Sequence, residues 1–188
     1  MGDLFMSILR IYTDGACANN QGDVNYGGWG SILEFKGVKK ELYGGEPNTT
    51  NNRMELTAVI EALKAIKKPD QEIEIFTDSS YVANCFREEW YVSWEKNKWK
   101  NAARKSVENQ ELWKELLALF RQHRVTFYRV KGHVNLESKS TNFDKLYEKF
   151  VQWNGTRFSF EDFKYVTTMN NRADELANMG IDSVRNVV

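Results

Sequence analysis

Residues 51–68, "NNRMELTAVIEALKAIKK", carry the pattern that decides the fold. Apolar residues recur there at steps of three and four, at Val59, Ala62 and Ile66, which predicts an amphipathic helix. Followed back toward the N-terminus, the same face reaches Glu55, so a carboxylate points to the side intended for the core. The segments before and after this helix indicate which fold contains it.

Strands are predicted on both sides of the helix, which Pro69 ends. Three strands precede it, at 7–15, 26–37 and 38–47. After it come a strand at 71–79, a helix from residue 80, a helix over about 106–122, a strand at 124–133 and a last helix stopped by Gly180. This order predicts an α/β fold in which helices flank a mixed sheet.

Length and composition fit one globular domain over residues 1–188. Apolar residues make up 41% of the chain and charged residues 28%, which suits a sizeable core and a solvated surface. No apolar run approaches the ~20 residues of a membrane span, and the N-terminus lacks a secretory signal. Cys17 and Cys85 have no metal-binding spacing, which predicts packed thiols. We therefore expect a cytoplasmic monomer without a membrane partner.

Two acidic residues end predicted strands. Asp14 in "TDG" and Asp78 in "TDSS" each follow threonine and precede a small turn residue. Carboxyl ends of strands are where open sheets place their ligands. Two structural alternatives stay open: "TDG" fits a turn whose aspartate bonds its own backbone, and "TDSS" fits a helix N-cap.

Two further acids lie at helix starts. Glu55 and Asp174 each follow an asparagine by three residues, Asn52 and Asn171, so each also fits a capping box. Four acids at element ends, without an equal set of buried bases, repel one another unless they protonate or a cation enters. Hard oxygen ligands favour Mg²⁺ or Mn²⁺ over zinc. Two such ions ~3.5–4 Å apart stabilise an in-line displacement at phosphorus.

The chain resembles type 1 ribonuclease H through six motifs in the family's order: "IYTDGAC" with "GG.G" at 11–30, "TTNNRMEL" at 49–56, "FTDSSYV" at 76–82, "WKNAARKSVEN..LW" at 99–113, "VKGH" at 130–133 and "RADELA" at 172–177. The resemblance implies a ribonuclease H-like mixed five-stranded sheet, with three antiparallel strands and then parallel strands. It also implies hydrolysis of the RNA strand of RNA/DNA hybrids, leaving 5′-phosphate and 3′-hydroxyl ends. Two Mg²⁺ ions, or Mn²⁺ as a substitute, would be held by Asp14, Glu55, Asp78 and Asp174.

The same resemblance assigns residues around the acids. His133 matches a mobile-loop histidine, for which we expect an auxiliary role in proton transfer or product release. Asn20 and Asn52 match asparagines that contact nucleotides, and Thr50 matches a contact to a phosphate of the DNA strand, while Asn52 also fits a helix cap. Ser80 stands where the family often has glutamine, so a base or sugar contact is expected to be lost or bridged by water.

Residues 94–105 form a local basic patch in a chain of zero net charge. They match the basic handle of the family's bacterial members, where Trp90, Trp94 and Trp99 recur. The bases are Lys96, Lys98, Lys100, Arg104 and Lys105. A charge run often forms only a solvated face, and the tryptophans also fit the packed base of the handle. Bases interleaved with tryptophan nevertheless predict salt-sensitive binding to a nucleic acid backbone without sequence preference.

Residues 134–170 lengthen the chain between His133 and Asp174 relative to compact members of the family. The segment holds eight aromatic residues, so we expect it to fold, with a helix along "FDKLYEKFVQW" and a turn at Asn154-Gly155. The favoured interpretation is a satellite hydrophobic cluster packed on the domain. The alternative is a lid or an additional wall of the substrate groove.

Two other functions compete with a hybrid-specific nuclease. The fold also serves DNA-cutting and strand-transferring enzymes such as integrases and transposases, which the intact "NNRMEL" and the handle disfavour. A non-catalytic hybrid-binding module would show an acid-to-amide change at one of the four acidic positions. None is present.

Overall fold

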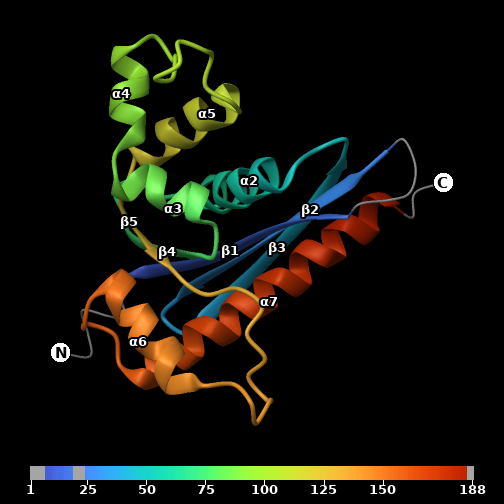
Figure 1. Cartoon of the computed structure of the whole chain (residues 1–188), viewed down its shortest axis with the longest axis vertical. Helices are drawn as coiled ribbons and strands as arrows, with labels where there is room; N and C mark the ends of the chain where they lie inside the picture. Colours follow the sequence, from blue (N-terminus) through green and yellow to red (C-terminus); the bar gives the residue numbers. More distant parts are fainter. Residues whose placement is uncertain (1–6, 19–23, 186–188) are drawn as a thin grey trace.

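The computed structural model describes residues 7–18 and 24–185, which form a mixed sheet flanked by helices (Figure 1). The sheet contains five strands in the order β3-β2-β1-β4-β5. Their bounds are β1 Leu9–Ala18, β2 Tyr26–Phe35, β3 Val38–Pro47, β4 Glu72–Thr77 and β5 Arg124–Arg129. Strands β1, β2 and β3 pair antiparallel, whereas β4 pairs parallel to β1 and β5 parallel to β4. The expected ribonuclease H-like α/β architecture is confirmed.

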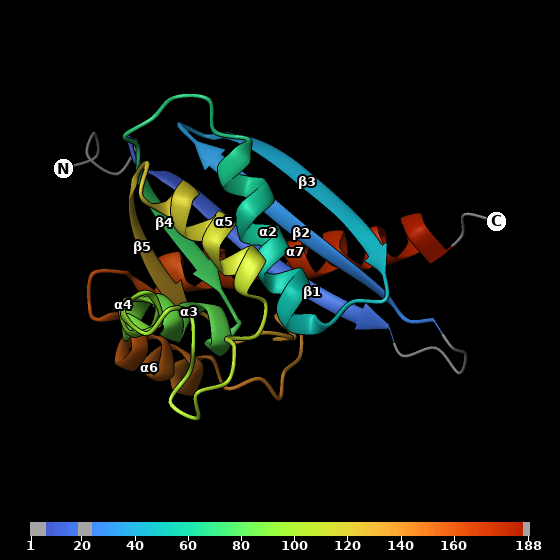
Figure 2. The ribbon, with the colours of Figure 1, turned by 90° about the horizontal axis from the view of Figure 1, so that it is seen from above.

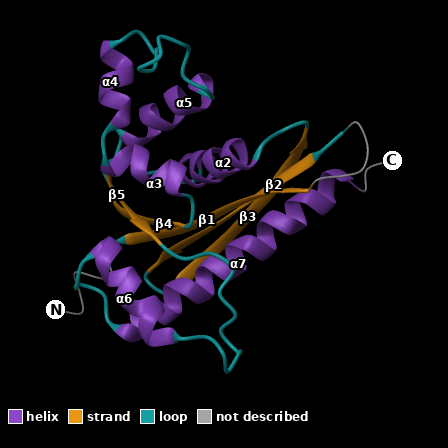
Figure 3. Cartoon of the chain, in the orientation of Figure 1, coloured by secondary structure: helices purple, strands orange, loops and turns teal. Residues whose placement is uncertain are grey.

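Helices cover both faces of this sheet, as Figures 2 and 3 show. Their bounds are α2 Asn51–Lys64, α3 Ser80–Arg87, α4 Trp90–Lys96, α5 Gln110–Phe120, α6 Phe143–Asn154 and α7 Phe160–Arg185. Helix α2 packs on β1, β2 and α5, while α7 crosses β1, β2 and β3 on the opposite face. Among the described residues, no helix is both long and apolar enough to cross a bilayer.

Two cores lie on the two faces of the sheet because neighbouring strand residues point in opposite directions. Ile11 and Ile75 belong to the core beneath α2 and α5. Tyr12 and Phe76 follow them in the sequence and belong to the core beneath α6 and α7, where their rings stack with centroids 5.4 Å apart. The central strands are therefore buried on both sides.

The last helix is much longer than expected. Helix α7 begins at Phe160 and continues to Arg185, so the predicted stop at Gly180 is wrong. Gly180 serves close packing instead, because a Cβ there would collide with the carbonyl of Gly44 on β3. The helix predicted over 106–122 is shorter than expected, since α5 begins only at Gln110, after Asn109 in the left-handed region with φ 58°.

The segment 134–170 contributes a loop, the predicted helix α6 and the first part of α7. Phe150 and Phe158 are only 2% and 1% exposed and belong to the core that contains Tyr12 and Phe76. The segment therefore packs on the domain as favoured, but as part of a main core and not as a satellite. Gly155 makes the expected turn with φ 84°.

Candidate active site

Three carboxylates converge near the middle of the sheet. Asp14 lies on β1, and Asp78 directly follows Thr77, which pairs in parallel register with Thr13 on β1. Glu55 projects from α2 toward both. One oxygen from each of the three carboxylates lies within 4.8 Å of the other two. Strand order thus brings together acids that lie far apart in the sequence.

Asp14 lies within its strand and not at its end. The prediction of a strand ending at Asp14-Gly15 is wrong, because pairing with β2 extends β1 to Ala18 and places Asp14 opposite Gly30. The expected local bond still forms, since Gly15 N–H donates to Asp14 Oδ1 over 2.9 Å, but no turn accompanies it. Gly15 matters for another reason: a Cβ there would lie 2.5 Å from the backbone nitrogen of Glu55. Because glycine has no Cβ, α2 can approach β1 closely at this position.

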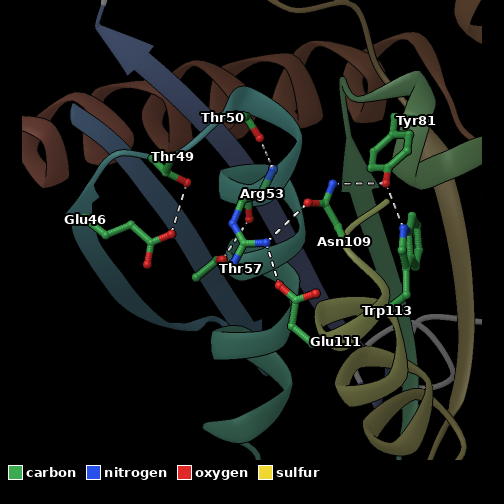
Figure 4. Close-up of polar contacts among 9 residues, drawn as sticks. All are labelled: Glu46, Thr49, Thr50, Arg53, Thr57, Tyr81, Asn109, Glu111 and Trp113. Atoms are coloured by element: carbon green, nitrogen blue, oxygen red, sulfur yellow. Dashed lines mark hydrogen bonds and ion pairs between the residues drawn. The ribbon is translucent and has the colours of Figure 1, made fainter. Parts of the chain in front are cut away.

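Polar contacts fix the start of α2, the helix that carries Glu55 (Figure 4). Thr50 is the N-cap, because its hydroxyl accepts from Arg53 N over 3.2 Å, so the capping roles considered for Asn52 and Glu55 are wrong. The Arg53 guanidinium then donates to Asn109 Oδ1 over 3.2 Å and to Glu111 over 2.6 Å, which ties α2 to α5. Glu55 therefore takes no part in capping α2, and its side chain lines the cleft.

Asp78 is followed directly by Ser79, the residue that caps the next helix. Ser79 caps α3 by accepting from Val82 N over 3.2 Å, so the alternative that Asp78 is an N-cap is wrong. On the other side of Asp78 lies Gly132, where a Cβ would collide with Asp78 Oδ2. A larger residue at position 132 would have to displace this carboxylate. The next residue, His133, has φ 56°.

Asp174 stands at the rim of the acidic group. Its side chain is 28% exposed, and its Oδ2 lies 3.9 Å from His133 Nδ1. It lies inside α7, where Asn171 donates to the carbonyl of Val134 over 2.9 Å, so the capping box proposed for Asn171 and Asp174 is wrong. Asp174 still acts on the cluster, because its side chain helps to raise the pKa of Asp14.

Burial dominates the electrostatics of the three inner acids. Asp14 is 3% exposed, and burial together with the charges of Glu55 and Asp78 raises its pKa to about 11. Burial and the charge of Asp78 raise the pKa of Glu55 well above its usual range, and burial likewise raises the pKa of Asp78. Among the described residues, Glu55 Oε2 is buried without a hydrogen-bond partner. A divalent cation would satisfy that oxygen and offset the repulsion, so the cluster suits a divalent metal.

The acids line an open cleft of about 570 Å³. Of the predicted substrate-binding residues, Asn52 and Ser80 line this cleft, and His133 lies at its edge. Thr50 is exposed at the start of α2, whereas Asn20 lies outside the described residues. Cys17 also lines the cleft and donates to the carbonyl of Thr49, while Cys85 is buried, so both thiols are packed and unpaired.

Several cleft residues escaped the sequence analysis. Asn51, Tyr81 and Asn178 line the cleft, and buried Asn170 lies near enough to Asp78 to lower its pKa. Asn170 precedes Asp174 by about one helical turn, so helical spacing from Asp174 could have identified it.

The predicted handle projects beyond the sheet at α4 and the loop after it (Figure 1). Its five bases are exposed, and four of them line a groove of about 430 Å³: Lys96, Lys98, Lys100 and Arg104. The tryptophans pack the base of the handle, since the Trp94 ring centroid lies 5.8 Å from Trp99, 6.4 Å from Trp90 and 5.4 Å from Trp113. Glu95 pairs with Arg121, and in the described ranges 7–18 and 24–185 the handle lysines form no ion pair with a carboxylate.

Comparisons with known proteins identify the family to which the chain is similar. A sequence model of the RNase H family matches residues 6–152. Ribonuclease H of Thermoanaerobacter pseudethanolicus is 52% identical over 132 residues, which cover 70% of this chain and 83% of the relative. Ribonuclease H of Chlorobium luteolum is 54% identical over 125 residues, covering 66% and 83%.

Solved structures share the fold. LC9-RNase H1, a type 1 RNase H with the type 2 active-site motif, aligns with a TM-score of 0.60 at 25% identity, covering 87% of this chain and 85% of its own. The solution structure of the PFV RNase H domain aligns at 0.63 and 25%, covering 93% and 94%. LC11-RNase H1, solved with an RNA/DNA hybrid, aligns at 0.58 and 22%, covering 95% and 99%, which shows the fold alone. The chain belongs to the RNase H family.

Proposed function

We propose that this protein is an endoribonuclease that hydrolyses the RNA strand of RNA/DNA hybrids and leaves 5′-phosphate and 3′-hydroxyl ends. The observation that carries the proposal is the convergence of Asp14, Glu55 and Asp78 oxygens within 4.8 Å, with Glu55 Oε2 buried and unpartnered. Family membership supports the reaction and the substrate.

The acids would hold two divalent cations, with Mg²⁺ favoured and Mn²⁺ as a substitute, because the donors are all hard oxygens. Oxygens of Asp14, Glu55 and Asp78 lie within 4.8 Å of one another, and Asp174, which is 28% exposed, lies beside His133. When bound, such a cation pair stabilises the attacking and leaving oxygens of an in-line displacement at phosphorus. His133, exposed and beside Asp174, is positioned to assist proton transfer or product release.

Substrate contacts would come from both sides of the acids. Asn52 and Ser80 face the cleft, where a 2′-hydroxyl would distinguish RNA from DNA. Thr50 lies at the α2 N-terminus, which favours a phosphate. The exposed bases of the handle would contact the backbone. We infer that the protein acts as a monomer in the cytoplasm, and its two unpaired thiols fit a reducing compartment.

Cleavage assays would test this function directly. End-labelled RNA/DNA hybrid, duplex RNA, duplex DNA and single-stranded RNA are incubated with the protein, with Mg²⁺ or with chelator. We expect metal-dependent cutting of the RNA in the hybrid alone. Cutting of DNA would favour a DNA nuclease, and hybrid binding without cutting would favour a non-catalytic module.

A paired variant separates chemistry from folding. Asp14→Asn should reduce turnover by more than about 100-fold, which is the upper end of the loss typical for changes to residues that only support metal ligands. Hybrid binding should survive. Asp182→Asn, an exposed change near the end of α7, is the matched control and should keep full activity. Joint loss of fold and binding in Asp14→Asn would mean that Asp14 is structural.

A further inference from the structure

A second groove adjoins the acidic cleft and is larger, at about 930 Å³ against 570 Å³. Its walls are the loop 131–142 and one side of α6, which lie together at the end of the molecule opposite the handle (Figure 3). His133 lines both hollows, so the groove begins where the acidic cleft ends. A chain that leaves the cleft past His133 would enter this groove.

Charge in the groove is predominantly positive. Lys131 comes from the loop, and Lys145 and Lys149 project from the same side of α6, four residues apart. Glu148 is the one acid in its lining. Within the described part of the chain, none of the three lysines forms an ion pair with a carboxylate, so their charges remain available to an anion.

An aromatic side chain also lines the groove. It is Trp153, and Lys149 Nζ lies 5.4 Å from its ring centroid. The guanidinium of Arg129, on β5, lies 4.3 Å from the same ring. These cation–π contacts help to hold the ring in place, and Arg129 adds a further positive charge beside it.

The loop wall is well ordered by its own polar contacts. Asn135 Oδ1 accepts from the backbone N–H groups of Glu137 and Ser138 over 3.0 and 3.1 Å. Thr141 donates to the carbonyl of Asn135 over 2.7 Å, and Asn171 on α7 donates to Val134. The loop is therefore tied both to itself and to the helix that carries Asp174.

The helical wall is anchored just as firmly. Phe150 is buried in the core beneath α6 and α7. Asn154 accepts from Arg129 N over 3.0 Å and donates to Arg129 O over 2.8 Å, which extends the edge of β5. A groove formed before binding loses little entropy when it is occupied.

We infer that this groove binds the phosphate backbone of the RNA strand next to the cleaved bond. The inference rests on the proposed function, which places the scissile phosphate at the acids. The RNA strand is the one that passes over the acids, and His133 is where that path reaches the groove. The hybrid is then held at both ends of the molecule, by the handle and by this groove (Figure 1).

Charge reversal tests the groove without disturbing the core. Lys145→Glu with Lys149→Glu changes two exposed side chains, and Lys67→Glu with Lys68→Glu, at the end of α2 remote from Glu55, is the matched control. Hybrid affinity is measured by fluorescence anisotropy across a salt series, and turnover by cleavage of labelled hybrid. Unchanged melting temperatures verify that both variants fold.

We expect the groove variant to bind hybrid roughly tenfold more weakly, with a salt slope reduced by about 1.8 for two lost contacts to a duplex. Its KM should rise while kcat at saturating hybrid stays near that of the unmodified protein, because the acids are untouched. The control variant should match the unmodified protein in both. An unchanged salt slope, or an equal loss in the control, would overturn the proposal.

A second substrate identifies the strand. In a hybrid whose DNA strand carries neutral methylphosphonate linkages, the ratio of affinities between unmodified protein and groove variant should persist. Loss of that ratio would assign the groove to the DNA strand and overturn the proposal. The unmodified protein reports separately on the proposed function: if it cuts hybrid while the groove variant behaves identically, only the groove assignment fails.

Discussion

Removing divalent cations should make the stability of this protein fall as pH rises from 5 to 8. Burial raises the folded-state pKa values of Asp14, Glu55 and Asp78, whereas in the unfolded chain these groups titrate near their usual ~4. Between those values the folded state binds more protons than the unfolded state. The stabilisation is therefore complete below the unfolded pKa and is lost progressively toward the folded pKa.

The size of the effect follows from the excess proton. One extra proton in the folded state changes the free energy of unfolding by about 1.4 kcal/mol per pH unit, or about 4 kcal/mol over three units. For a chain of 188 residues this corresponds to a melting temperature lower by roughly 8–16 °C at pH 8 than at pH 5. A bound cation replaces the proton, so saturating Mg²⁺ should flatten the profile.

Thermal unfolding followed by circular dichroism at pH 5, 6, 7 and 8, with chelator or with Mg²⁺, measures this difference. Groups elsewhere in the chain contribute alike to both series, so the gap between them isolates the acids. Asp14→Asn removes one carboxyl group and should give a shallower profile in chelator, while the exposed control Asp182→Asn should follow the unmodified protein. Coincident profiles with and without Mg²⁺ would refute the reasoning.

Three substitutions test other parts of the structure. Gly132→Ala should lower turnover by about 10–100-fold with little change in melting temperature, because the added methyl group displaces Asp78; unchanged kinetics would show that the loop yields freely. Phe158→Ala should lower the free energy of unfolding by about 3–5 kcal/mol in urea titration, and a loss below 1 kcal/mol would contradict its place in a main core. His133→Ala should reduce kcat by about 10–100-fold while Mg²⁺ dependence is retained, as steady-state rates across a Mg²⁺ series would reveal.

The acids were predictable because they depend on strand order. Alternation located β1 and β4, and parallel neighbours place Asp14 and Asp78 at one level of the sheet. Helical spacing located the inward face of α2, and Glu55 is 8% exposed as that pattern required. Predicting that these three side chains converge required only the correct fold, and local sequence patterns indicate that fold well.

Element ends were predicted less well, because tertiary contacts decide them. Pairing with β2 extends β1 past the "TDG" signal, and Thr50 takes the cap position that sequence spacing gave to Asn52. Gly180 reads as a helix stop but lies against Gly44, where only a glycine permits the approach. None of these outcomes is encoded in neighbouring residues alone.

The long insertion was the hardest part to place. Its helix was visible in the apolar stripe, but its partners were not, because aromatic residues do not specify which face of a sheet they cover. The structure joins it to the sheet through Phe158 and through Arg157, whose guanidinium pairs with buried Glu74 on β4. A charged residue inside a strand pattern was the available signal, since a buried glutamate needs a base.

Zero net charge conceals a separation of charge that the fold creates. Carboxylates converge near the middle of the sheet, and exposed lysines lie on either side of them, in the handle and along α6. A polyanion is attracted to the ends and repelled by the centre until cations neutralise the acids. Under the proposed function, hybrid and cation should therefore favour each other's binding, and linkage requires the two effects to be equal in size. The repulsion expected to destabilise the metal-free protein would thus be the same interaction that makes substrate binding depend on metal.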